Sequence, residues 1–330
     1  MMDEILLDKI RGCLMGAMIG DAMGMPWEAL SREAILDLTN GKGVQGFEDP
    51  GVRKIKDSEK ATLGDTTDDW FLTKTVAESL IACKGFDINH QALRHVKALE
   101  TSTFGCGKTT KNSIKEIKDY FDSRGEVGRN PAIKAVNDGA GNGVAMKIAP
   151  LACFNSVLST SRKRYIGDET FIDNIYDLGY MTHQNVDASY SAVVVAVYIF
   201  KNLTNYSLHP IIPINSKVHE KLSLALTLKS TDSLVRKIGC GFVCWESVPF
   251  SIAMAMNHMN DFKAGMLATL SAGGDADSNA GMVGALIGSN VGLSGIPKEW
   301  KEFRPEYKEA IELADKLYVS WNTIQKHIGI

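Results

Sequence analysis

Apolar residues recur along much of this 330-residue chain at spacings of three and four, the period of a helix that buries one face. Three such stripes are clear, near residues 10, 75 and 225. They contain Ile5, Leu6, Ile10, Cys13, Leu14, Ala17 and Met18; Phe71, Leu72, Thr75, Val76, Ser79 and Leu80; and Leu222, Leu224, Ala225 and Leu228. We find little of the alternation between apolar and polar residues that is typical of half-buried strands, so the pattern predicts an all-α fold.

Residues that favour the first turn of a helix support these assignments. The signals are Ser31 before Glu33, Thr66 and Thr67 before Asp68 and Asp69, and Pro305 before a last helix of about 20 residues. The run from Val193 to Tyr198 is β-branched, but the apolar stretch around it is long enough for a buried helix, and we predict one there.

We find no low-complexity linker, so residues 1–330 are predicted to form a single domain. Two glycine-rich and polar segments, Thr39–Thr66 and Ser123–Pro131, read as loops. Loops of this length in a compact domain are often functional.

Composition narrows the class of protein. A net charge of -3 gives no general surface for nucleic acid or for an anionic membrane. The six cysteines form no CxxC pair, no cleavable apolar leader opens the chain, and the longest apolar stretch, Ala192–Phe200, is short for a membrane span. We therefore expect a cytoplasmic monomer that binds no membrane.

Two acidic clusters carry the main chemical signal. "GDTTDDW" (Gly64–Trp70) stands at a predicted helix start, where capping alone explains one acid or hydroxyl but not the whole run. "SAGGDADSNAGMVGALIG" (Ser271–Gly288) places two aspartates before a small, apolar run. Together they offer an all-oxygen set that suits hard cations, and we predict a pair of Mg²⁺ or Mn²⁺ ions. The proposed ligands are Thr67, Asp68, Asp69, Asp275, Asp277 and Ser278.

Three further stretches are rich in glycine. "GAMIGDAMGMPWEAL" (Gly16–Leu30) suggests a helix that runs into a turn with Asp21 and then Glu28. "FGCGKTT" (Phe104–Thr110) and "GAGNGVAMKIAPLA" (Gly139–Ala152) are weak signals for phosphate binding before a helix, and a plain tight turn explains each equally well.

The order of these motifs resembles the ADP-ribosylglycohydrolase family. The resemblance runs from Gly12 to Pro297, through "GCLMGAMIGDAMGMPWE", "TDD", "FGCGKT", "GNGVAMKIAPL", "MTHQNVDASYSAVVVAVYI", "WESVPFSIAMAM" and "GGDADSNAGMVGALIGSNVGLSGIP". It implies a compact, single-domain orthogonal helical bundle with a two-metal cleft. It also implies a hydrolase that cleaves the glycosidic bond at C1″ of ADP-ribose, releasing it from a modified protein or another acceptor.

The resemblance also assigns roles to residues. It implies that the six oxygen ligands above bind the metals and that Glu28 acts from a movable loop. From the chemistry of the reaction, we expect Asp69 or Asp277 to accept the proton of the attacking water. The substrate would be bound by Gly105, Gly107, Gly141, Asn142, Gly143 and His183. By itself, His183 is more typical of a partner of a helix C-terminus, and it is the family motif that favours a place close to the ribose. Lys147 stands where many members have arginine, and Ser278 where many have threonine; the roles of Lys147 and Trp245 stay open.

Two other functions fit parts of this pattern. An inactive relative that binds ADP-ribose or serves as a structural protein has no need of the complete acidic set. A different two-metal hydrolase acting on a nucleotide-like substrate would release phosphate instead of ADP-ribose.

Overall fold

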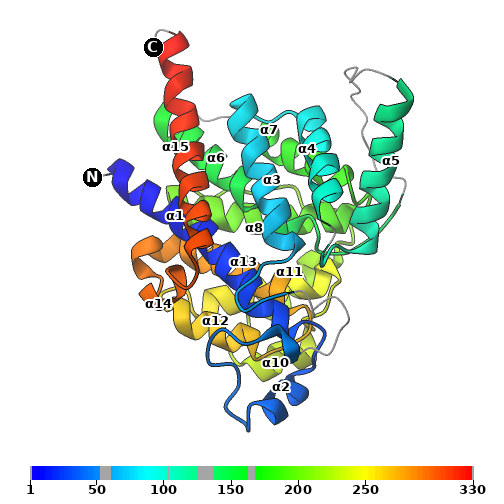
Figure 1. The fold of residues 1–330 in the computed structure, drawn as a ribbon, viewed down its shortest axis with the longest axis vertical. Helices are drawn as coiled ribbons and strands as arrows, with labels where there is room; N and C mark the ends of the chain where they lie inside the picture. The colour runs from blue at the N-terminus through cyan, green and yellow to red at the C-terminus, as the bar shows by residue number, and fades with distance from the viewer. Residues whose placement is uncertain (1, 53–60, 103, 125–136, 163–167, 329–330) are drawn as a thin grey trace.

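The computed structural model describes residues 2–52, 61–102, 104–124, 137–162 and 168–328, and within these ranges it contains helices and no strand. Two isolated β-bridges join Ser31 to Gly273 and Gly141 to Val243. The helices pack around one apolar core (Figure 1). The prediction of an all-α fold is therefore confirmed. The predicted loop Ser123–Pro131 lies mostly outside the described residues.

The helices follow one another along the chain, separated by connections of very different length. They are α1 (Met2–Gly24), α2 (Arg32–Leu38), α3 (Asp68–Cys83), α4 (Ile88–Thr101), α5 (Lys108–Arg124), α6 (Ala149–Arg162), α7 (Asp168–Tyr180), α8 (Val186–Thr204), α9 (Lys217–Ala225), α10 (Thr231–Lys237), α11 (Cys244–Asn257), α12 (Phe262–Leu270), α13 (Ala276–Val291), α14 (Lys298–Lys301) and α15 (Lys308–Ile328). The 3₁₀ turns are η1 (Met25–Trp27), η2 (Pro50–Val52), η4 (Ala145–Lys147), η5 (Leu293–Gly295) and η6 (Pro305–Tyr307).

The predicted helix starts agree with the structure. Ser31 caps α2 by accepting from the N–H of Ala34, Thr67 caps α3, and Pro305 opens η6, which leads directly into α15. The buried run Val193–Tyr198 lies inside α8.

Three predictions were wrong in detail. Helix α1 continues to Gly24, so Asp21 lies in its last turns and not in a loop. Ile5, assigned to a buried stripe, is 59% exposed, because the start of α1 extends past the core. Helix α9 ends at Ala225, which leaves Leu228 beyond it and Leu224 exposed.

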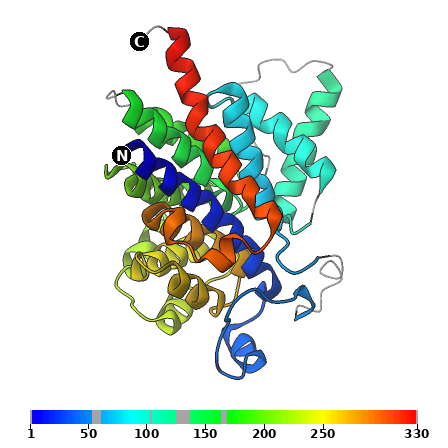
Figure 2. The same cartoon turned by 60° about the vertical axis from the view of Figure 1, so that its left-hand side comes forward.

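Helices α1 and α13 form the central contact of the molecule. They run antiparallel, since Gly12 faces Gly288 whereas Gly24 faces Asp277. A Cβ atom at Gly16 would overlap the carbonyl oxygen of Gly284, so the two backbones touch directly. Figure 1 shows α13 beside α1 near the centre, and Figure 2 shows α15, in red, running alongside α1, in blue. This close approach places the start of α13, with its acidic residues, beside the end of α1.

Helix α8 is long and apolar enough to cross a membrane by length and composition, but 67% of its apolar window is buried inside the fold. It packs against α6, α7 and α13. This is the environment of a core helix. All six cysteines are free thiols, as the absence of CxxC spacing predicted.

Candidate active site

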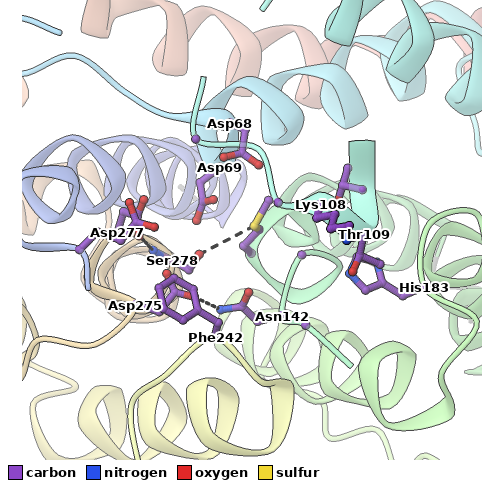
Figure 3. Close-up of a pocket in the computed structure, with 17 residues that line it drawn as sticks. Asp68, Asp69, Lys108, Thr109, Asn142, His183, Phe242, Asp275, Asp277 and Ser278 are labelled. Carbon is purple, nitrogen blue, oxygen red and sulfur yellow. Dashed lines mark hydrogen bonds between the residues drawn. The ribbon is translucent and has the colours of Figure 1, made fainter. Parts of the chain in front are cut away.

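A cleft of about 290 Å³ opens between the start of α3, the start of α13 and the glycine loops (Figure 3). The structure brings nearly all of the predicted site residues to its walls. Those that line it are Glu28, Asp68, Asp69, Gly105, Gly107, Gly141, Asn142, Gly143, His183, Asp275, Asp277 and Ser278. Figure 3 shows the aspartates on one side and Lys108, Thr109 and His183 on the other.

Thr67 is the predicted ligand that does not line the cleft. Its hydroxyl donates to Asp21 Oδ1 at 2.9 Å and accepts from the N–H of Asp69 at 3.2 Å. Asp21 also accepts from the N–H groups of Thr67 and Trp70, at 3.0 and 2.9 Å. One buried carboxylate from α1 therefore holds the first turn of α3 and sets the direction of Asp68 and Asp69.

The α13 side is oriented by a chain of buried hydrogen bonds. The Asn142 amide donates to Asp275 Oδ2 at 2.7 Å and to Ser247 Oγ at 2.8 Å. Ser247 donates to Asn279 Oδ1 at 2.7 Å, and the Asn279 amide donates to the carbonyl oxygen of Cys240. Asn142, predicted to bind substrate, thus uses its side chain to orient an acid of the cleft.

Asp68, Asp69 and Asp277 are buried close to other carboxylates, and this disfavours their ionised forms. Burial and then repulsion by Asp21 raise the pKa of Asp68 to about 7. Burial and then repulsion by Asp68 raise the pKa of Asp69 well above its usual range. Burial and then repulsion by Glu28 do the same to the pKa of Asp277. Asp69 Oδ2 is buried without a hydrogen-bond partner among the described residues.

Oxygen atoms of Glu28, Asp275 and Asp277 lie within 4.8 Å of one another. Three carboxylates at this separation, beside an unpartnered buried oxygen of Asp69, form a donor set that fits a hard divalent cation. A bound cation would favour the ionised form of each acid. The cleft can therefore hold a metal.

The segment that carries Glu28 is held more firmly than the sequence suggests. The N–H of Ala29 donates to Gly274 O at 2.7 Å, and the N–H of Gly274 donates to Leu30 O at 2.8 Å. Ala29 has a φ of 64°, a conformation that the surrounding contacts must maintain. Glu28 is thus tied to the turn before Asp275 through backbone hydrogen bonds, and its action from a movable loop stays a prediction.

The glycine loops line the cleft with backbone that carries no side chain. Gly105 has a φ of 78°, and a Cβ atom there would lie 2.6 Å from Asp68 Oδ1. Helix α5 starts at Lys108, directly after this loop, as the phosphate-binding interpretation requires. A Cβ at Gly143 would lie 3.1 Å from His183 Cε1. Burial lowers the pKa of His183 to about 3, so its ring is neutral.

Sequence reasoning missed several residues of this region. Asp21 is fully buried and organises α3, although its position between two glycines was the only local signal. Phe242 and Met146 also line the cleft. Trp245, in contrast, lies outside the cleft lining and packs under the ammonium of Lys217, 4.5 Å from the ring centre.

Sequence and structure comparisons show which known proteins this chain resembles. A family model described as ADP-ribosylglycohydrolase matches residues 2–326. ADP-ribosylhydrolase ARH3 of Homo sapiens is 25% identical, over 94% of this chain and 93% of that protein. ADP-ribosylarginine hydrolase Tri1 of Serratia proteamaculans is 24% identical, over 94% of this chain and 79% of that protein. A solved structure titled "ADP-ribosylglycohydrolase-related protein complex" has the same fold, with a TM-score of 0.66, 22% identity, and coverage of 96% of this chain and 99% of that one.

Proposed function

Because this chain belongs to the ADP-ribosylglycohydrolase family, we propose that it is a metal-dependent hydrolase that cleaves the glycosidic bond at C1″ of ADP-ribose and releases ADP-ribose from a modified protein. The observation that carries the proposal is one cleft in which the aspartates of α3 and α13 face glycine loops and a neutral histidine. Two of the relatives are named an ADP-ribosylhydrolase and an ADP-ribosylarginine hydrolase, and these names support the same class of substrate.

The cleft would hold two Mg²⁺ or Mn²⁺ ions, since its donors are all oxygen atoms. Asp68 and Asp69 would bind from α3, and Asp275, Asp277 and Ser278 from α13. Thr67 joins this set only if its hydroxyl leaves Asp21. When bound, the ions supply Lewis-acid chemistry at the ribose oxygens and a water of lowered pKa.

The chain's own residues then stabilise charge, transfer protons and bind the substrate. Positive charge develops on the ribose as the bond to C1″ breaks, and the carboxylates that line the cleft stabilise it. Asp69 or Asp277 accepts a proton from the attacking water, and Glu28 protonates or positions the leaving group. His183, being neutral, contacts the ribose as a hydrogen-bonding group rather than as a charge.

The opposite side of the cleft would hold the diphosphate. Gly105, Gly107, Gly141 and Gly143 line the cleft and would offer their backbone N–H groups to it. The positive end of α5, which begins at Lys108, faces the same space.

The test is release of ADP-ribose from a panel of proteins modified on arginine or on serine, in the presence of Mg²⁺. We expect free ADP-ribose from at least one substrate, and none with the variant Asp69→Asn. Binding of ADP-ribose without release from any substrate would indicate an inactive relative. Release of phosphate instead would indicate a different two-metal hydrolase.

A further inference from the structure

Lys147 lies behind the cleft, in η4, and its side chain is entirely buried. The adjacent residue Met146 lines the cleft, but Lys147 does not, so its ammonium is not placed to touch a ligand there. Its Nζ has no hydrogen-bond partner among the described residues. A buried ammonium without a partner is costly unless the surrounding charges favour it.

The basic side chains near Lys147 are neutral. His95 is fully buried and its Nδ1 lies 2.8 Å from the carbonyl oxygen of Gln91, so Nδ1 carries the proton and Nε2 is an acceptor. Burial and then the charge of Lys147 lower the pKa of His95 well below its usual value. The same two causes act on His183.

The thiol nearest to Lys147 offers no negative charge either. Burial and then the charge of Asp68 raise the pKa of Cys106 to about 12, so it remains a thiol. The Thr73 hydroxyl of α3 donates to the carbonyl oxygen of Met146 at 3.4 Å, so η4 packs against the helix that carries Asp68 and Asp69. These two carboxylates are the negative groups that attract Lys147. Burial lowers the pKa of Lys147 to about 8, which leaves it protonated at neutral pH.

We propose that Lys147 is a built-in counter-charge of the cleft, a positioning residue that partly neutralises Asp68 and Asp69 from the interior and weakens their affinity for a divalent cation. This inference rests on the proposed cation site. It does not rest on hydrolysis. The cation and Lys147 compete for the same two carboxylates, so the lysine sets how readily the acidic pair binds and releases an ion.

The test is calorimetric titration of the metal-free full-length protein with Mg²⁺ alone. Lys147→Met removes the charge and preserves the approximate volume, and we expect it to bind Mg²⁺ at least about ten-fold more tightly. Lys147→Arg preserves the charge and should bind as the wild type does. Gln91→Met, which changes another buried polar side chain without changing charge, is the matched control and should leave the affinity unchanged.

A merely structural lysine would predict unchanged or weaker binding in Lys147→Met, and either result in a folded variant overturns the proposal. If Lys147→Met does not fold, Lys147→Gln carries the same expectation. Failure of both neutral variants to fold, while Lys147→Arg folds, would mean that the charge serves folding and would also overturn the proposal. Tighter Mg²⁺ binding in a protein whose wild type releases no ADP-ribose would support this inference and contradict the proposed function.

Discussion

The buried carboxylates of the cleft differ in their hydrogen-bond partners. Asp21 accepts three hydrogen bonds from the start of α3, and Asp275 accepts one from the amide of Asn142. Asp69, in contrast, retains a buried oxygen without a partner among the described residues. Asp21 is suited to holding the first turn of α3 in place, and Asn142 orients Asp275, whereas Asp69 is suited to binding a ligand that the protein itself does not supply.

Substitutions at Glu28 and Asp277 can distinguish a role in catalysis from a role in metal binding. Glu28→Gln retains size and hydrogen bonding but loses the acid, so we expect it to bind substrate and at least one Mg²⁺ while kcat falls at least about 100-fold. Asp277→Asn should lose metal as well, because Asp277 is anchored at the start of α13. Metal analysis and kinetics check both variants. If the two behave alike in both measurements, Glu28 is an ordinary ligand.

Asp21 supports the cleft without lining it. Asp21→Asn offers one acceptor oxygen in place of two and turns an amide N–H toward the donors of Thr67 and Trp70. We expect the free energy of unfolding to fall by about 2–3 kcal/mol, with weaker Mg²⁺ binding, measured by urea unfolding and titration. The control is Asp87→Asn. Asp87 caps the exposed start of α4, and asparagine caps equally well, so this substitution should change the free energy of unfolding little. Equal effects of the two substitutions would contradict the assigned role.

At the scale of elements, the contact between α1 and α13 determines where the acids lie. Small residues recur every four positions on both helices, which puts them on one face of each. The facing sets are Gly12, Gly16, Gly20 and Gly24 on α1, and Ala276, Ala280, Gly284 and Gly288 on α13. Because the backbones touch, any side chain added there moves α13 and with it Asp277.

Two glycines of α13 give a matched comparison. Gly284→Ala places a methyl against the carbonyl of Gly16, and we expect the free energy of unfolding to fall by about 2 kcal/mol or more despite the helix propensity of alanine. A Cβ at Gly281 would lie 3.5 Å from Ala17 O, an ordinary contact, so Gly281→Ala should be neutral or stabilising by up to about 1 kcal/mol. Urea unfolding of both variants is the measurement, and similar losses would refute the direct backbone contact.

At the scale of the whole molecule, the buried acids couple stability to pH and to metal. In the metal-free protein, burial raises the pKa of Asp21 and Asp68 to about 7, and those of Asp69 and Asp277 lie well above the usual range. In the unfolded chain these groups ionise near pH 4. The folded state therefore binds more protons at neutral pH, and its stability falls as pH rises.

We expect the metal-free protein in EDTA to melt at a higher temperature at about pH 6.5 than at about pH 7.5. The buried histidines oppose this only below their ordinary pKa of 6.5, and Lys147 opposes it only above a pKa of about 8. Saturating Mg²⁺ should raise the melting temperature and remove or reverse the slope, because a bound cation favours the ionised acids. A slope of the same size and sign with and without Mg²⁺ would contradict a cation site at these aspartates.

The sequence by itself determined the helices, their capped starts at Ser31 and Thr67, and the chemical character of the cleft. These follow from the local period and from residues within a few positions of each other. Nearly every predicted site residue lines one cleft because each motif sits at a helix start or in a glycine loop.

Only the tertiary structure decided which faces meet. Asp21 reaches Thr67 across 46 positions, and Asn142 reaches Asp275 across 133. The backbone contact of α1 with α13 and the burial of Lys147 behind the aspartates likewise depend on packing between distant segments. A local pattern specifies that a side chain is polar or small. It does not specify its partner, because the partner is chosen by the free energy of the whole packed core.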